Sequence, residues 1–194
     1  MSIDLQKAFD MVRPNLLIQD IINSLNHTPI RPNTVRLLST YLKGRMACVR
    51  YNNCTSPYRH ARTGVPQGSC LSPVLFNFFV STYPQTDSPS TSYADDFTDS
   101  YSDVDVTSAA GVLSAHASDV AAWAGGRGLT ISAAKSTITL FTSDLHQSHL
   151  HPQVSLLNSP LPLNRNPRIP VVTFEPHFTF SPHIRKKERS LLKS

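Results

Sequence analysis

The sequence predicts an α+β domain, and three observations support that class. Apolar residues recur at helical spacing in three stretches, residues 14–26, 32–43 and 107–124. Residues 45–62 instead have the alternation and turn residues of a β-hairpin. These elements follow no strict β-α-β order, and a chain of 194 residues with 40% hydrophobic and 16% charged residues suits one folded domain with a sizeable core.

The first elements of the chain are a short strand and two helices. Ile3-Asp4-Leu5 is expected to end a strand. The first helix begins at Pro14, because the missing N–H of proline costs nothing at the first helical position. The second helix begins at Pro32 and stops at Gly44.

A hairpin, a loop and an apolar helix are expected next. The hairpin turns at Asn52-Asn53, with one strand from Met46 and the return strand around Tyr58. Residues 64–68 follow as a loop that no regular element favours, and Ser72-Pro73 then begins a helix that extends to Val80.

The second half is predicted to contain short strands around one long helix. Residues 82–92 are polar and turn-rich, and a short segment from Tyr93 to Phe97 follows with paired acids at its centre. The helix over residues 107–124 is expected to end at Gly125-Gly126. Ser136 to Phe141 alternates in the manner of a strand.

These patterns divide the chain into four segments. Residues 1–142 form the main domain, and residues 143–170 are a proline-rich irregular connection. Residues 171–184 are expected to form a second hairpin. Residues 185–194 are a basic tail, for which a solvated end is the favoured interpretation.

Composition excludes several classes of protein. No stretch approaches the ~20 apolar residues of a membrane helix, and the N-terminus does not resemble a signal peptide, so an intracellular protein is expected. The three cysteines contain no CxxC pair and fit neither a disulfide framework nor a zinc knuckle. The net charge of +5 favours polyanionic partners.

Three motifs carry the functional signal. They are Asp4-Leu5-Gln6-Lys7-Ala8-Phe9-Asp10, Gly64-Val65-Pro66-Gln67-Gly68-Ser69-Cys70-Leu71-Ser72-Pro73 and Tyr93-Ala94-Asp95-Asp96. A lone acid pair is a solvated turn about nine times in ten. Acids from two distant segments that converge across a sheet are different, because they make a site for two divalent cations. Asp4 and Asp95 meet that demand, and carboxylates suit Mg²⁺.

The three motifs in this order resemble the reverse transcriptase family. The continuation of the middle motif as Val74-Leu75-Phe76-Asn77 resembles the branch found in non-LTR (LINE-type) retrotransposons. The resemblance implies a polymerase palm, a small antiparallel sheet backed by helices, with the fingers and thumb mostly missing from this chain. It implies RNA-directed DNA synthesis with Mg²⁺ or Mn²⁺, deoxynucleoside triphosphates, an RNA template and a DNA primer. It implies no membrane and a nuclear site of action, and leaves the oligomeric state open.

The resemblance also implies roles for residues. Asp4, Asp95 and Asp96 would bind the metal ions, with Asp96 often less directly engaged. Phe9 would exclude a 2′-hydroxyl, although an ordinary core position is the alternative. The stretch Pro66-Gln67-Gly68 would line the nucleotide pocket, and Gly64 and Gly68 would permit positive φ and close backbone approach.

Two further elements are implied less specifically. Lys135 resembles a lysine that would stabilise or protonate the leaving pyrophosphate, and a solvated lysine is an equal alternative. Phe174 and Phe178 resemble a primer-grip hairpin and fit plain packing equally well. The histidines at 146, 149 and 151 are interpreted as a polar loop rather than a metal site.

Departures from the family pattern leave other functions open. Pro170-Val171 stands where the family usually has Leu-Gly, and Gly125-Gly126 stands where polar residues are common. One alternative is a catalytically inactive palm remnant that still binds nucleic acid. The other is a decayed element without function.

Overall fold

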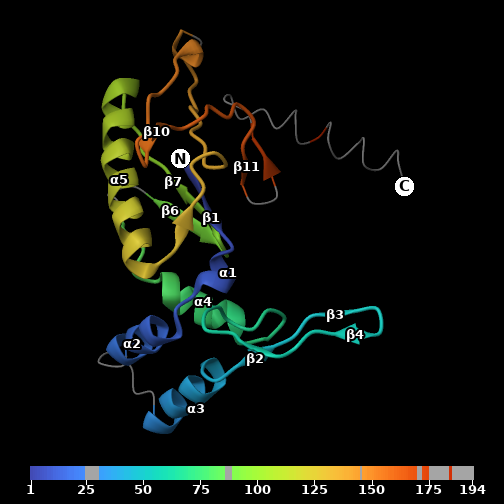
Figure 1. The fold of residues 1–194 in the computed structure, drawn as a ribbon. Coiled ribbons are helices and arrows are strands. Elements are labelled where there is room, and N and C mark those ends of the chain that lie inside the picture. The colour runs from blue at the N-terminus through green and yellow to red at the C-terminus, as the bar shows by residue number, and fades with distance from the viewer. Residues whose placement is uncertain (25–30, 86–88, 145, 170–171, 175–183, 185–194) are drawn as a thin grey trace. The chain divides into compact units, whose positions relative to one another are not determined.

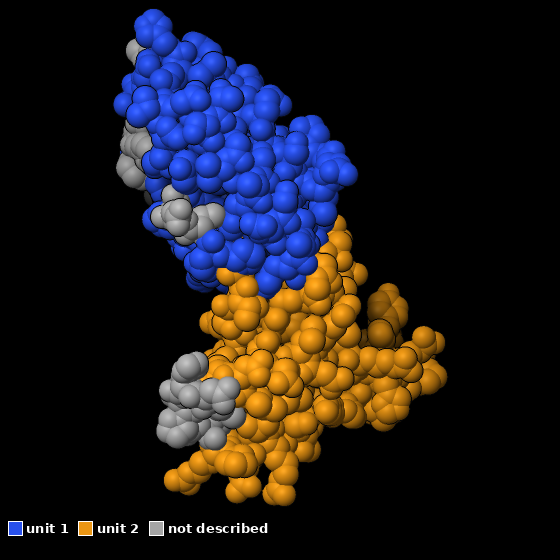
Figure 2. Space-filling model, turned by 90° about the vertical axis from the view of Figure 1, so that its left-hand side faces the viewer, with its two compact units in different colours: residues 1–5, 84–123, 131–194 blue, residues 6–83, 124–130 orange. Residues whose placement is uncertain are grey.

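The computed structural model describes residues 1–24, 31–85, 89–144, 146–169, 172–174 and 184. The chain divides into two compact units (Figure 2). Unit 1 comprises residues 1–5, 84–123 and 131–194, and unit 2 comprises residues 6–83 and 124–130. We describe each unit by itself.

Helices and short antiparallel strands are mixed along the chain, which confirms the α+β class (Figure 1). The helices are α1 (Ala8–Met11), α2 (Pro14–Ser24), α3 (Pro32–Leu42), α4 (Ser72–Val80), α5 (Val106–Arg127) and the 3-10 turn η1 (Gln147–His149). The strands are β1 (Ser2–Gln6), β2 (Met46–Ala47), β3 (Arg50–Tyr51), β4 (Cys54–Thr55), β5 (Arg59–His60), β6 (Ser90–Tyr93), β7 (Asp96–Asp99), β8 (Thr130–Ile131), β9 (Ser155–Leu156), β10 (Ser159–Pro160), β11 (Arg168–Ile169) and β12 (Val172–Thr173).

The largest sheet has the strand order β6-β7-β1-β8, with β7 antiparallel to both β6 and β1. Ile3 and Phe97, which face each other in the register of β1 and β7, are both buried. The Trp123 ring on α5 meets the Phe97 ring edge-on, with centroids 6.4 Å apart. The helix therefore covers the buried face of the strand that carries Asp96 (Figure 1).

The polar segment before Tyr93 forms strand β6 although it lacks apolar residues. β6 stands at the edge of the sheet, and it is largely exposed. A strand in that position needs no apolar face, because the neighbouring β7 supplies the buried residues Phe97 and Asp99. Polar sequence is thus compatible with pairing here.

The predicted end of the long helix at Gly125-Gly126 is wrong, because α5 continues to Arg127. Gly128, with φ of 71°, is the residue that leaves the helix. Its N–H bonds the Gly125 carbonyl at 3.1 Å, and the Leu129 N–H bonds the Ala124 carbonyl at 2.8 Å. These two bonds form a Schellman motif, which requires left-handed backbone only at the residue after the helix.

Arg127 gives a physical reason for the extra turn. Its guanidinium pairs with the Asp20 carboxylate and lies over the Phe79 ring, 4.2 Å from the centroid. Both contacts lie within unit 2. They offset the cost of about 1 kcal/mol that each helical glycine imposes relative to alanine.

The predicted strand over residues 136–141 is also wrong. Only Thr137 and Ile138 pair, as isolated bridges with Ser2 and Leu163. The first bridge is antiparallel and the second is parallel, so neighbouring residues bond to different segments. No continuous ladder forms under those conditions, although the apolar alternation predicted one.

Unit 2 is built on α2, which packs against α3 and α4. Leu17 and Ile21 on α2 and Phe76 and Phe79 on α4 are buried. The predicted helices at Pro14 and Pro32 and the hairpin that turns at Asn52-Asn53 are confirmed within the described residues. The hairpin extends away from the helices of its unit (Figure 1), and every residue from 46 to 60 is exposed.

The C-terminal part of unit 1 contains short strand pairings in the proline-rich segment and at the start of the predicted second hairpin. β9 pairs with β10, and β11 pairs with β12. The rest of the predicted second hairpin, including Phe178, and the basic tail lie outside the described residues. Over the part that is described, no helix has the length and apolar character required to cross a bilayer.

Candidate active site

The three predicted metal-binding acids come together at one end of the sheet in unit 1. Asp4 on β1 is the direct cross-strand partner of Asp96 on β7. Asp96 also pairs with Tyr93 on β6, which leaves Ala94 and Asp95 as a two-residue turn. Acids that are more than ninety residues apart in sequence therefore lie together at one end of the sheet, here termed the acidic edge.

The turn that carries Asp95 has an unusual backbone. Ala94 has φ of 56°, a conformation that residues other than glycine seldom adopt. Positive φ at the first central position is a property of type II′ turns, which suit the twist of a hairpin. The hairpin geometry thus holds Asp95 beside Asp96 at the cost of local strain, a combination found at functional sites.

The charges of the three acids act on one another. Partial desolvation raises the pKa of the Asp96 carboxyl, and the nearby charges of Asp95 and Asp4 raise it further. Asp4 and Asp95 are half-buried, whereas Asp96 is exposed. The edge is therefore a region of negative potential open to solvent, which a cation would relieve.

Asp4 is held from the side of β8 by the turn at residues 132–136. The Asp4 N–H donates to the Ser136 hydroxyl at 3.1 Å, and the Asp4 carbonyl accepts from the Ser132 N–H at 2.9 Å. The Ser136 hydroxyl in turn donates to the Ser132 carbonyl at 2.8 Å, and both serines are buried. Sequence reasoning assigned these serines no role, although both lie in the stretch that resembles the fourth family motif.

Lys135 lies in the same turn. Its N–H bonds the Ser132 carbonyl at 3.1 Å, and its side chain is exposed. The backbone of Lys135 is thus tied to the segment that fixes Asp4, whereas its ammonium group extends into solvent. Whether it acts on a leaving group stays a prediction.

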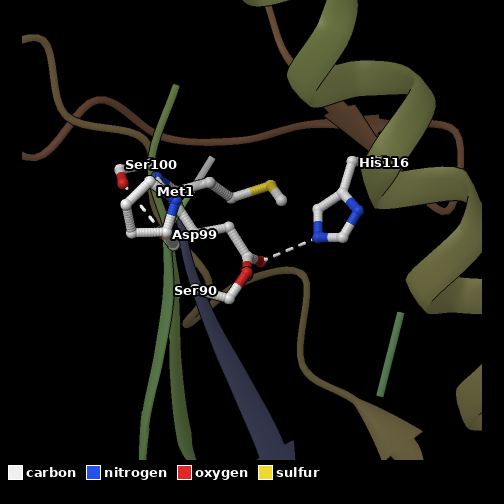
Figure 3. Close-up of polar contacts among 6 residues, drawn as sticks. Met1, Ser90, Asp99, Ser100 and His116 are labelled. Atoms are coloured by element: carbon white, nitrogen blue, oxygen red, sulfur yellow. Dashed lines mark hydrogen bonds and ion pairs between the residues drawn. The ribbon is translucent and has the colours of Figure 1, made fainter. Parts of the chain in front are cut away.

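A polar cluster forms around the buried Asp99 of β7 (Figure 3). The Asp99 carboxylate accepts a 2.7 Å bond from the Ser90 hydroxyl and lies 3.3 Å from His116 Nε2. Asp99 is fully buried and His116 is 4% exposed. The cluster joins β6, β7 and α5, so it fixes the strand that carries Asp96.

Sequence analysis missed this cluster. The available signal was His116, which shares a helical face with Leu113 and Val120 and is therefore expected to be buried. A buried histidine needs a polar partner. The sequence offered no means of choosing Asp99 as that partner.

In unit 2 the predicted nucleotide-pocket residues gather around α1. The Phe9 ring stacks on the Phe76 ring, with centroids 4.3 Å apart and planes inclined by 20°. Phe9 remains half-buried rather than buried. One face of the ring packs in the core, and the residue keeps an accessible part.

The loop at residues 64–68 is bonded directly to α1 and its C-terminal end. The Val65 N–H donates to the Phe9 carbonyl at 2.9 Å, and the Gly64 N–H donates to the Val12 carbonyl at 2.7 Å. The Gln67 amide donates to the Asp10 carboxylate at 2.8 Å. The first and second motifs are therefore adjacent within unit 2.

Gly64 is required by this close approach. A Cβ at Gly64 would lie 3.0 Å from the Asp10 Cα, and the backbone has φ of 85°. Gly68 also has positive φ, at 82°, but has open space around it. Pro66 is held through its carbonyl, which accepts the Ser72 hydroxyl at the start of α4.

Phe174 packs in unit 1, where its ring meets Phe141 edge-on at 6.4 Å. This contact is consistent with the packing alternative and does not test the primer-grip role. Within the described residues, no three His, Cys, Asp or Glu side chains are arranged closely enough to hold a metal ion. The three acids share an edge without forming a ready-made coordination sphere.

Comparisons with known proteins agree with the motifs. The family model for reverse transcriptase (RNA-dependent DNA polymerase) matches residues 1–179. The chain is 26% identical over 198 residues to the RNA-directed DNA polymerase from mobile element jockey of Drosophila funebris, covering 97% of this chain and 21% of that protein.

Two proteins of Drosophila melanogaster are also similar. The chain is 29% identical over 196 residues to the probable RNA-directed DNA polymerase from transposon BS, covering 96% of this chain and 21% of that protein. It is 29% identical over 154 residues to the probable polymerase from transposon X-element, covering 76% of this chain and 17% of that protein. The chain thus spans about a fifth of the length of these relatives. Because one family model accounts for residues 1–179, the chain belongs to the reverse transcriptase family, as its resemblance to non-LTR retrotransposon polymerases predicted.

Proposed function

We propose that this chain is the palm portion of an RNA-directed DNA polymerase from a non-LTR retrotransposon. The observation that carries the proposal is the cross-strand pairing of Asp4 with Asp96, with Asp95 in the adjoining turn. Two-metal nucleotidyl transfer requires carboxylates from separate segments at one place. The family match supports the same activity.

Asp4 and Asp95 would hold Mg²⁺ or Mn²⁺, with Asp96 as a neighbouring ligand. Their carboxylate oxygens are the donors that these hard cations prefer. Partial desolvation and repulsion from the carboxylates of Asp95 and Asp4 raise the pKa of Asp96. This repulsion supports the fit, because a bound cation would relieve it. Such ions would supply Lewis-acid stabilisation of the negative charge that develops in phosphoryl transfer, while the carboxylates of Asp4 and Asp95 would hold them in place.

The remaining motif residues would bind and orient the nucleotide. Phe9 would limit space near the sugar, and Pro66, Gln67 and Gly68 would line the base-pair pocket. The bonds from Val65 to Phe9 and from Gln67 to Asp10 support this grouping, because they join the two motifs within unit 2. Lys135 would stabilise or protonate the leaving pyrophosphate, and its side chain is exposed as that role requires.

The partners of the whole protein follow from this activity. An RNA template, a DNA primer and deoxynucleoside triphosphates would be its substrates, and chromosomal DNA in the nucleus would be its place of action. The relatives are about five times longer than this chain, so fingers and thumb would be contributed by other parts of such a protein. Phe174 and Phe178 would contribute to a primer grip.

Primer extension on poly(rA)/oligo(dT) with dTTP and Mg²⁺ or Mn²⁺ tests the proposal. The wild-type chain should extend the primer, and the Asp95→Asn variant should not. The Asp119→Asn variant should extend it like the wild type, because Asp119 is an exposed acid on the outer side of α5. Isothermal titration with Mn²⁺ gives a second readout. Metal binding that is unchanged by Asp95→Asn would rule out the assigned role of that residue.

A catalytically inactive nucleic-acid-binding remnant is the second candidate. It is favoured by the net charge of +5 and by the lack of a compact metal-binding cluster among the described residues. Such a protein would bind RNA or DNA with a steep salt dependence and without regard to Asp95→Asn. A folded chain that binds neither Mn²⁺ nor nucleic acid would leave only the decayed element.

A further inference from the structure

Charge is distributed unevenly between the two units. Unit 2 contains ten Lys and Arg residues against two Asp, whereas unit 1 contains eight against eleven Asp and Glu. Residues 21–86 contain seven Lys or Arg and no acid at all. The excess positive charge of the chain therefore belongs to unit 2, which contains only two acidic residues of its own.

The hairpin of residues 45–62, here termed the basic arm, concentrates part of this charge. Its cationic residues are Arg45, Arg50, Arg59 and Arg62, and His60 adds a titratable group. Two tyrosines accompany them: Tyr51 is 77% exposed and Tyr58 is 66% exposed. Exposed aromatic rings that stand among cationic side chains suit a partner with both stacking surfaces and negative charge.

Only one arginine of the arm has a structural task. The Arg45 guanidinium donates to the carbonyls of Leu42, Thr63 and Gly64, which fixes the base of the arm. Among the residues that the structure describes, no carboxylate forms an ion pair with Arg50, Arg59 or Arg62. These three guanidinium groups are therefore available to a ligand.

The strand register distributes polar and aromatic side chains over both faces of the arm. Arg59 pairs with Ala47 and His60 pairs with Met46, so Arg59 and His60 point to opposite faces. Arg50 and Tyr51 are likewise neighbours on one strand and point to opposite faces. A flexible nucleic-acid strand can contact both faces of the arm by wrapping around it, whereas a partner with a rigid, flat surface can contact only one face.

A hollow of about 500 Å³ lies at the base of the arm within unit 2. Its polar lining is basic, with Lys43, Arg45, His60 and Arg62, and no acid contributes to it. The hollow is large enough for a phosphodiester group with its sugar. It extends the positive surface of the arm into a concave site.

We propose that the basic arm and this hollow bind single-stranded nucleic acid, with phosphates on Arg50, Arg59, Arg62 and Lys43 and bases stacked on Tyr51 and Tyr58. The combination of a positive surface with exposed aromatic rings is the usual basis of single-strand binding. The proposal rests on the proposed function only in taking nucleic acid as the ligand. It requires neither metal ions nor the acids of unit 1.

The first test compares two charge-matched double variants. A labelled 20-nucleotide single-stranded RNA is titrated in EDTA at several salt concentrations, and binding is followed by fluorescence anisotropy. Arg50→Gln with Arg59→Gln should weaken binding about tenfold or more at 0.1 M salt and reduce the salt slope by about 1.4, at ~0.7 per lost phosphate contact. Arg165→Gln with Arg168→Gln, exposed arginines of unit 1, should change Kd less than about twofold.

The second test separates stacking from charge. Tyr51→Ala with Tyr58→Ala should weaken binding about tenfold or more without changing the salt slope, because the rings release no counterions. The matched control, Tyr51→Phe with Tyr58→Phe, should retain binding since it keeps both ring faces. All these side chains are exposed, so thermal unfolding should be unaffected.

Several outcomes would overturn the proposal. Equal losses in the two arginine pairs would indicate general charge attraction rather than the arm. Tighter binding of a duplex of equal length, or equal competition by polyglutamate, would reject a single strand as the partner. Asp95→Asn should not change RNA binding in EDTA. A wild-type chain that binds RNA through the arm but extends no primer would count against the proposed function alone. A chain that extends primers but binds RNA equally well without the arm arginines would count against this inference alone.

Discussion

The acidic edge of unit 1 and the basic arm of unit 2 hold their charges in opposite ways. At the acidic edge, Asp4, Asp95 and Asp96 are brought together by strand pairing and a strained turn, and partial desolvation together with the charges of Asp95 and Asp4 raises the pKa of Asp96. On the arm, Arg50, Arg59 and Arg62 are spread over an exposed hairpin. Concentrated charge costs stability and would favour a bound cation, whereas dispersed charge costs little and suits an extended polyanion.

The acidic edge and the basic arm also differ in how firmly the surrounding residues hold them. The strand with Asp96 is fixed by the buried Asp99 and His116 and by the half-buried Ser90 (Figure 3). Within the described residues, the side-chain bonds that anchor the arm lie at its base, through Arg45. A catalytic site needs positions fixed to a fraction of an ångström, and a strand-binding surface does not.

Asp4→Asn should have the largest effect of these substitutions, and it should affect the acidic edge but not the basic arm. We expect primer extension to fall by about a thousandfold or more, because a neutral amide cannot hold the divalent cation on which the proposed transfer depends. Single-strand binding in EDTA should be unchanged. Parallel assays of extension and anisotropy on the same protein check both statements, and a variant that extends primers normally would contradict the assignment of Asp4.

Asp99→Ala should have the largest effect on stability. It removes the buried carboxylate that accepts a hydrogen bond from the half-buried Ser90 hydroxyl and lies beside the buried His116, at a cost of about 2–4 kcal/mol in the free energy of unfolding. Urea titration measures the loss, with Asp119→Ala as the exposed control, expected within about 0.5 kcal/mol. Equal stability of the two variants would show that the cluster does not support β7.

Gly64→Ala tests the corresponding close contact in unit 2. The new Cβ would meet the Asp10 backbone at 3.0 Å and would force alanine to φ of 85°, so the free energy of unfolding should fall by about 1–3 kcal/mol. Gly68→Ala shares the positive φ but has open space, and should cost less. Similar losses for both variants would assign the effect to backbone conformation alone.

Asp96→Asn is expected to have the smallest effect, and its sign depends on pH. Since the pKa of Asp96 is raised in the folded state, the folded protein binds the proton more tightly, and its stability falls as pH rises through that pKa. The variant should therefore be slightly more stable than wild type at neutral pH, by a few tenths of a kcal/mol after solvent screening, and not at pH 3. Thermal unfolding at both pH values, with and without Mg²⁺, measures this. A gain that persists at pH 3 would exclude repulsion as its cause.

Local sequence signals predicted much of the fold. Proline at the first helical position located α2 and α3, and the Asn52-Asn53 turn located the arm hairpin. The glycine pair at 125–126 misled the prediction, because Arg127 extends α5 through contacts with Asp20 and Phe79 that lie far away in sequence. The alternation at 136–141 misled it as well, because consecutive residues there pair with different segments.

By itself, the amino-acid sequence determined the family, the order of the three motifs and the choice of Asp4, Asp95 and Asp96, because those depend on residue type and spacing along the chain. It also contained the acid-free stretch of residues 21–86, which the net charge of +5 concealed. Tertiary structure alone decided that Ser132 and Ser136 hold Asp4, that Asp99 meets His116, and that the arginines of the arm stand without carboxylate partners among the described residues. Such pairings depend on which distant segments meet, and no local pattern encodes that choice.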